Sequence, residues 1–173
     1  LCTLLIKEKY LSLYSNSILA PMLSMYNDYN GILKYLEATK ANTIVIGPGS
    51  GVKKSTQDIL LLALRLEKNI VMDADCISVF ANKPAILKKA INNINNIVIT
   101  PHEGEFNRLF RNLDGPKVKR ALYASKYLNA VIILKGSDTI IASPDGRVAI
   151  NYNAPPYLAT AGSGDVLSGI IAG

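Results

Sequence analysis

Short apolar segments rich in β-branched residues alternate along the chain with longer segments in which apolar residues recur every three or four positions. A short apolar run bounded by turn residues predicts a buried strand, and the longer spacing predicts an amphipathic helix. The predicted strands are residues 1–6, 43–46, 70–73, 97–100, 131–134, 139–142 and 148–152. The predicted helices are residues 31–39, 55–68, 84–91, 105–110 and 118–129, with a weak helix or loop over 7–17 and a loop over 21–30.

This alternation predicts an α/β fold whose mostly parallel sheet is covered by helices on both faces. The turn signal Ser143-Pro144-Asp145-Gly146 joins the last two strands and predicts a late antiparallel hairpin. Residues 1–173 are long enough for one domain with a substantial core. We expect a single partial domain, truncated at both ends, because Leu1 is no initiator Met and the last predicted helix stops early at Gly173. Such a fragment should be less stable than a longer product.

Composition narrows the class of protein. Hydrophobic residues make up 49% of the chain and charged residues 18%, which indicates a packed globular protein rather than a disordered one. The net charge of +6 is scattered without interleaved aromatic residues, which favours solvated helix faces over a nucleic-acid surface. No apolar run approaches membrane-spanning length, and Cys2 and Cys76 have no metal-ligand spacing. We expect a cytoplasmic homo-oligomer with reduced thiols that acts on small molecules and has neither nucleic-acid nor membrane partners.

Residues that could bind or react with a ligand follow several of the predicted strands, and open α/β sheets bind their ligands at these strand ends. The first such stretch, Gly47-Pro48-Gly49-Ser50-Gly51, follows the strand at 43–46. Val52 stands where a dinucleotide fingerprint needs its third glycine, so we discount that site. A glycine-rich turn still lets a flat or phosphorylated ligand approach the backbone, and the alternative is a plain tight turn.

Acids and the only histidine follow the next two strands. Asp73-Ala74-Asp75 can order a loop, cap a helix or reach Mg²⁺ indirectly. We favour the structural roles because no third carboxylate completes a metal cage. His102 lies in the turn Thr100-Pro101-His102-Glu103-Gly104-Glu105. Its position after a proline at a strand end favours a hydrogen bond to a ligand over a packed core position.

The stretch Lys135-Gly136-Ser137-Asp138-Thr139 follows the strand at 131–134. It can offer backbone N–H groups, a hydroxyl and an ammonium to a nucleotide phosphate, and the alternative for Lys135 is a surface lysine beside a hairpin. Four separate strand ends thus carry Gly, Asp, His or Lys, which is harder to obtain by chance than any single motif.

The last stretch, residues 159–173, carries Gly162-Ser163-Gly164-Asp165 and then an apolar helix pattern. Gly162 and Gly164 allow backbone angles that a side chain would forbid, so successive N–H groups can face one point. A helix that starts there adds unpaired N–H groups and a positive dipole end, which suits phosphate. A carboxylate there repels phosphate, so its presence needs a function. Taking the proton from a hydroxyl that attacks the phosphate is such a function. Asp165 is therefore a candidate general base, and the alternative is a helix cap.

These motifs occur in the order, and at about the spacing, of the ADP/ATP-dependent NAD(P)H-hydrate dehydratases, which the chain resembles from about Gly47 onward. That family has a ribokinase-like fold, and residues 159–169 are its most specific match. The resemblance implies a carbon–oxygen lyase that repairs the hydrated form of NADH and NADPH. ADP, or else ATP, would phosphorylate the hydrate hydroxyl, and loss of phosphate would restore the nicotinamide ring. Mg²⁺ would accompany the nucleotide.

The resemblance also implies roles for individual residues. Asp165 would be the catalytic base and would contact the hydrate. The turn from Gly162 to Gly164 would hold the transferred phosphate. The implied nucleotide-binding residues are Lys135, Gly136, Ser137, Asp138, Thr139, Gly162, Ser163 and Gly164. The other implied substrate-binding residues are Gly49, Gly51 and His102, and no residue is implied as a metal ligand.

Two departures from the family pattern keep other functions open. Ala154-Pro155-Pro156-Tyr157 replaces a Gly-Asn-Pro-Gly-like approach to the last motif, and Cys76-Ile77 follows Asp73-Ala74-Asp75 where the family has Ala-Leu. One alternative is a kinase of the same fold that acts on a vitamin precursor alcohol, which Thr100-Pro101-His102 argues against. The other is a non-catalytic nucleotide-binding remnant, against which the presence of Asp165 speaks.

Overall fold

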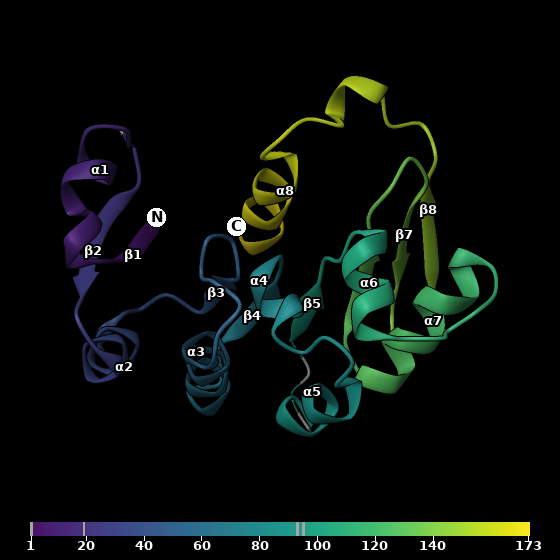
Figure 1. The fold of residues 1–173 in the computed structure, drawn as a ribbon, viewed down its shortest axis with the longest axis horizontal. Coiled ribbons are helices and arrows are strands. Elements are labelled where there is room, and N and C mark those ends of the chain that lie inside the picture. The colour runs from purple at the N-terminus through teal and green to yellow at the C-terminus, as the bar shows by residue number, and fades with distance from the viewer. Residues whose placement is uncertain (1, 19, 93, 95) are drawn as a thin grey trace. The chain divides into compact units, whose positions relative to one another are not determined.

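The computed structural model describes residues 2–18, 20–92, 94 and 96–173. The chain divides into two compact units, Leu1–Ala41 and Asn42–Gly173 (Figure 1). The single domain expected from the sequence stays a prediction. No helix in the described residues is long and apolar enough to cross a membrane.

The first unit contains a two-stranded parallel sheet, in which β1 (Thr3–Lys7) pairs with β2 (Met22–Tyr26). The 3-10 turn η1 (Glu8–Tyr10) and α1 (Leu11–Ser15) connect the strands, and α2 (Tyr29–Ala38) follows them. The loop predicted over residues 21–30 is therefore wrong. The segment has no β-branched residue, and its pairing with β1 at five successive positions makes it a strand. Leu1, where the first predicted strand begins, lies outside the described residues.

The second unit is built on a six-stranded sheet in the order β3-β4-β5-β6-β7-β8. The first four strands are parallel and the last two are antiparallel, which confirms the predicted late hairpin. The strands are β3 (Thr43–Ile46), β4 (Asn69–Met72), β5 (Ile97–Ile99), β6 (Val131–Leu134), β7 (Thr139–Ala142) and β8 (Val148–Asn151). Each coincides with a predicted strand to within one residue at either end.

Helices connect these strands and follow the last one. They are α3 (Lys54–Arg65), α4 (Asp75–Ser78), α5 (Pro84–Ala90), α6 (Glu103–Leu109), α7 (Lys117–Leu128) and α8 (Ser163–Ala172), with the 3-10 turn η2 (Pro156–Leu158) before α8. The short helix α4 was not predicted, because four residues are too few to show a helical period.

Helices lie on both faces of this sheet, as expected. The parallel strands follow one another in chain order, and right-handed connections then put the crossover helices on one face. There, Leu60 of α3 and Leu128 of α7 share a core with Ile70 and Ile99. Helix α8 packs on β3 and β4, and Figure 1 shows it on the other side of these strands from α3. Because β3 to β6 are parallel, their carboxyl ends lie at one edge of the sheet.

Candidate functional site

The end of β3 lies against the end of β4, and a glycine makes this approach possible. Gly47 has a φ of 133°, and a side chain there would lie 1.7 Å from the carbonyl oxygen of Asp73. Farther along the turn, Gly49 and Gly51 also have positive φ, of 65° and 82°. The backbone N–H of Gly51 donates to Asp75 Oδ2 at 2.7 Å. The predicted glycine turn is therefore tied to the next strand end.

The end of β4 is strained. Ala74 has φ 46° and ψ −117°, a region that a residue with a side chain rarely occupies and that costs about 1–3 kcal/mol. Its N–H donates to Asp73 Oδ1 at 2.9 Å, which holds this conformation. Asp75 begins α4 and accepts the bond from Gly51. Both aspartates thus make contacts that order this loop, in keeping with the structural roles favoured for them.

Asp73 also joins two distant parts of the chain. Its side chain is almost fully buried, and its Oδ1 lies 2.8 Å from Lys135 Nζ at the end of β6. Its Oδ2 accepts a hydrogen bond of 2.9 Å from the buried Ser168 Oγ on α8. Lys135 is consequently not the surface lysine of the alternative reading, because a buried carboxylate needs such a counter-charge.

His102 forms the N-terminal cap of α6. Its Nδ1 accepts hydrogen bonds from the N–H groups of Gly104 and Glu105, at 3.0 and 3.3 Å. Glu105 completes a capping box, because its Oε2 accepts from the His102 N–H at 2.9 Å. This use of Nδ1 puts the proton of a neutral ring on Nε2. The side chain is 53% exposed, so its contact with a ligand stays a prediction beside the observed cap.

The predicted nucleotide turn at 135–139 is stabilised by hydrogen bonds within the turn and by Lys117 of α7. The Thr139 hydroxyl donates to the Gly136 carbonyl at 3.1 Å, and the Gly136 N–H donates back to it at 3.3 Å. Lys117 Nζ bonds the carbonyl oxygen of Asp138 and, at 2.9 Å, its Oδ1. The hydrogen bond from Lys117 is the main cause that lowers the pKa of Asp138. Ser137 is exposed at the tip.

The N-terminus of α8 excludes the cap alternative for Asp165 and differs from the prediction at Gly164. The helix begins at Ser163, so Asp165 stands in its first turn and does not cap it. Gly162 is the cap, in the left-handed region with φ 84°, whereas Gly164 is helical. The expectation that both glycines need special backbone angles is therefore wrong for Gly164. Space explains Gly164 instead, since a side chain there would lie 3.2 Å from Lys135 Nζ.

The Asp165 carboxylate is exposed and has no hydrogen-bond or ion-pair partner among the residues that the structure describes. Ser163 Oγ donates to the carbonyl oxygen of Thr160, which braces the loop before the helix. Gly162 has no side chain to occupy the helix N-terminus. The Ser163 N–H donates to the Thr160 carbonyl at 3.3 Å, whereas the N–H groups of Gly164 and Asp165 have no side-chain cap and share one helical turn with the free carboxylate.

The structure brings most of the predicted motifs to one edge. His102 and Lys135 lie next to each other across an isolated parallel bridge, and the Lys135 N–H donates to the Pro101 carbonyl at 2.8 Å. Gly164 adjoins Lys135, which places the start of α8 at the same edge. Sequence reasoning missed Ser168 and Lys117, because both are on helices rather than at strand ends.

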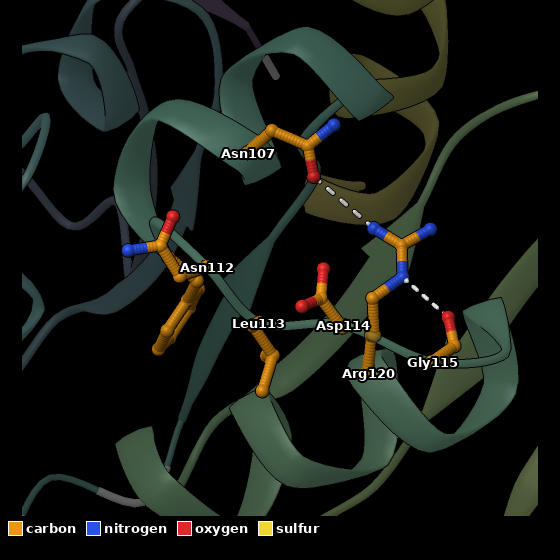
Figure 2. A pocket seen from close by; sticks show the side chains of 7 residues that line it. Asn107, Asn112, Leu113, Asp114, Gly115 and Arg120 are labelled. Atoms are coloured by element: carbon orange, nitrogen blue, oxygen red, sulfur yellow. Dashed lines mark hydrogen bonds between the residues drawn. The ribbon is translucent and has the colours of Figure 1, made fainter.

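A separate hollow lies between the end of α6 and the start of α7. Figure 2 shows Arg120 on one wall, with hydrogen bonds to Asn107 and to the carbonyl oxygen of Gly115. The Arg120 guanidinium also forms two bonds with Glu103, at 3.0 and 3.1 Å. Its charge is satisfied within the protein, so this hollow has no free cation for an anionic ligand.

No group of three or more His, Cys, Asp or Glu side chains in the described part of the chain could hold a metal ion. Asp73 is engaged by Lys135 and Ser168, and Asp138 by Lys117. This donor set fits a Mg²⁺ that is bound mainly through nucleotide phosphates, as Mg²⁺ commonly is, rather than in a protein cage.

Known proteins resemble this chain over most of its length. The family model of NAD(P)H-hydrate dehydratase matches residues 8–173. The bifunctional NAD(P)H-hydrate repair enzyme Nnr of Thermofilum pendens is 37% identical over 150 residues, covering 83% of this chain and 28% of the relative. The enzyme of the same name from Moorella thermoacetica is 40% identical over 140 residues, covering 78% of this chain and 26% of the relative.

Solved structures show the same similarity. The ADP/ATP-dependent NAD(P)H-hydrate dehydratase of Bacillus subtilis, co-crystallised with ATP/Mg²⁺ and soaked with CoA, has a TM-score of 0.75 and 27% identity, covering 100% of this chain and 63% of that one. A ribokinase-like superfamily protein of Enterococcus faecalis has a TM-score of 0.77 and 25% identity, covering 98% and 59%. The chain thus spans about a quarter of these curated relatives and about three fifths of these solved chains.

Proposed function

The chain belongs to the NAD(P)H-hydrate dehydratase family, and on that premise we propose that its protein dehydrates the hydrated form of NADH and NADPH. The phosphoryl donor is ADP, or else ATP, and it transfers its terminal phosphoryl group to the hydrate hydroxyl, which loses its proton. The carbon–oxygen bond then breaks, phosphate leaves with the oxygen and the electron pair, a proton is lost from the adjacent ring carbon, and the ring double bond is restored. With ADP the other products are AMP and inorganic phosphate.

One observation carries this proposal, and it is the composition of the first turn of α8. Gly162 leaves the N–H groups of Gly164 and Asp165 without a side-chain cap, and the Lys135 ammonium, which is paired with Asp73 and still 20% exposed, lies beside Gly164. Together they suit a phosphoryl group. Asp165 stands in the same turn with an exposed carboxylate. A site for binding phosphate alone gains nothing from an acid, whereas phosphoryl transfer from a nucleotide to a hydroxyl requires a proton acceptor.

The other strand ends supply the remaining roles. We propose that the turn at 135–139 binds the nucleotide and that Asp165 takes the hydroxyl proton. His102, whose ring is half-exposed, would contact the hydrate together with the turn at Gly49 and Gly51. Bound Mg²⁺ would neutralise charge on the nucleotide phosphates. We further propose a cytoplasmic homo-oligomer that acts on small molecules; the two free thiols support the reducing compartment and the scattered charge supports small-molecule substrates rather than nucleic acid.

Substrate choice tests the proposal against the kinase alternative. The native protein is incubated with hydrated NADH and ADP/Mg²⁺ or ATP/Mg²⁺, and in parallel with a thiazole or pyridoxal alcohol and ATP/Mg²⁺. We expect consumption of the hydrate and no phosphorylation of either alcohol. Phosphorylation of an alcohol with no action on the hydrate would establish the kinase. Binding of ADP without turnover of any of these substrates would establish the nucleotide-binding remnant.

A further inference from the structure

We propose that the buried Asp73 is a positioning residue of this site. It directs the Lys135 ammonium to the start of α8 and ties that helix to the strand ends through Ser168. The inference rests on the proposed function, because it concerns the group that would meet the transferred phosphate. The sequence favoured structural roles for Asp73, and the family resemblance assigned it no role in the reaction.

The contacts of Asp73 are specific to each of its oxygens. Oδ1 accepts from Lys135 Nζ at 2.8 Å and from the Ala74 N–H at 2.9 Å. Oδ2 accepts from Ser168 Oγ at 2.9 Å. Lys135 is 62 residues along the chain from Asp73, and Ser168 is 95 residues away. One carboxylate therefore fixes β6 and α8 relative to β4.

The Asp73 carboxylate lies close to the first turn of α8. A side chain at Gly164 would lie 3.2 Å from Lys135 Nζ and 3.8 Å from Asp73 Oδ2. Ser168 follows Gly164 by four residues and so lies on the same side of the helix. The ion pair is consequently beneath the helical turn that also carries Asp165. A shift of Lys135 or of α8 would change the distance between the cation and the proposed base.

Stability alone is a weak reason for this arrangement. A buried ion pair is often no more stabilising than apolar side chains of the same volume. The negative charge of Asp73 also opposes the binding of phosphate nearby, and the adjacent Ala74 is strained. A gain in the transition state would offset these costs, because the carboxylate fixes the direction in which the Lys135 ammonium points. Such an interaction raises turnover rather than ground-state affinity.

Two substitutions and their combination test this in the native protein. In Asp73→Asn we expect kcat to fall about tenfold or more, because misplaced groups slow transfer steeply. The Kd for ADP, measured calorimetrically, should stay equal or decrease, since a repelling charge is removed. Lys135→Met should weaken ADP binding. The double variant should be no slower than Lys135→Met, because Asp73 then has no ammonium to direct.

A matched pair of serines separates positioning from packing. Ser168→Ala removes the bond to Asp73 and leaves the ion pair in place, and we expect a lower kcat at unchanged ADP affinity. Ser125 on α7 is equally buried, and its Oγ has no hydrogen-bond partner within the described residues. Ser125→Ala should leave kcat unchanged. If Asp73→Asn does not fold, this pair carries the test, and equal effects of the two alanine substitutions would overturn the inference.

Other outcomes are equally decisive. Wild-type turnover by Asp73→Asn, or a double variant that multiplies the two single losses, would overturn the positioning role. An ADP affinity of Asp73→Asn as weak as that of Lys135→Met would also do so. If the wild-type protein turns over no hydrate, the proposed function fails, and the ADP affinities alone then decide whether Asp73 opposes or supports binding at Lys135.

Discussion

Asp165 is an acid in a turn that is otherwise suited to an anion. Its exposed carboxylate stands in the first turn of α8, where it would repel a phosphate. We predict that Asp165→Asn lowers kcat by about 10²-fold or more, the loss typical of a missing general base. ADP affinity should be retained or improved. Asp145→Asn, at an exposed aspartate paired with Arg147, is the control and should have no effect on kcat. Near-wild-type turnover by Asp165→Asn would end the assignment of this residue as the base.

Gly164 and Gly169 on α8 offer a second matched comparison at the scale of single residues. A side chain at Gly164 would meet Lys135 Nζ, whereas a side chain at Gly169 would meet nothing within 4 Å. Both positions are helical, so valine changes helix propensity similarly at each. We predict that Gly164→Val displaces the Lys135 ammonium and so removes one charge-assisted contact with ADP, which weakens ADP binding about tenfold. Gly169→Val should leave ADP affinity unchanged. Calorimetric titration measures both, and equal affinities would mean that Gly164 serves packing only.

At the scale of elements, His102 links a helix cap to a proposed substrate contact. Its Nδ1 holds the first turn of α6, its Nε2 lies 3.6 Å from Glu105 Oε1, and half of the side chain is exposed. We predict that His102→Ala costs about 0.5–2 kcal/mol of stability through the lost cap and also raises KM for the hydrate. In His102→Asn the amide oxygen can still cap the helix, so stability should recover while KM stays raised. Recovery of both would show that His102 is only a cap.

The short helix α4 buries a thiol, and this gives a prediction about pH. Burial, and secondarily the charge of Asp75, raises the pKa of Cys76 to about 12 from 9.0. A pKa raised by folding adds stability that is complete below about pH 9 and is lost as pH rises toward 12. We predict that at pH 8 a thiol reagent labels the exposed Cys2 in the folded chain and reaches Cys76 only after unfolding. In Cys2→Ser, rapid labelling of the native protein would contradict this burial.

The type of an element was predicted correctly where the local sequence pattern was strong. The prediction failed where the element was short or where a neighbouring strand determined its structure. The strands of the large sheet carry apolar β-branched runs, so periodicity identified them. β2 lacks such a run and is a strand because β1 lies beside it. α6 begins at Glu103, two residues earlier than predicted, because the His102 and Glu105 capping box extends it.

At the scale of the whole molecule, the sequence predicts which strand ends carry the chemistry but not which side chains touch there. The parallel order of β3 to β6 brings their carboxyl ends to one edge, and this follows from alternation alone. The bond between Ser168 and Asp73 joins residues 95 positions apart, and no local pattern indicates it. Lys117 likewise reaches the nucleotide turn from a helix. Such contacts depend on packing between elements rather than on propensity within them.

The stoichiometry of a single reaction tests whether phosphoryl transfer drives the dehydration. The native protein is mixed with hydrated NADH and ADP/Mg²⁺, and NADH, AMP and inorganic phosphate are measured together over time. We expect the three products to form in equal amounts, because each phosphoryl transfer at the start of α8 ends in the loss of one phosphate and the restoration of one ring. Release of AMP and phosphate without NADH, or formation of NADH without use of a nucleotide, would contradict this expectation.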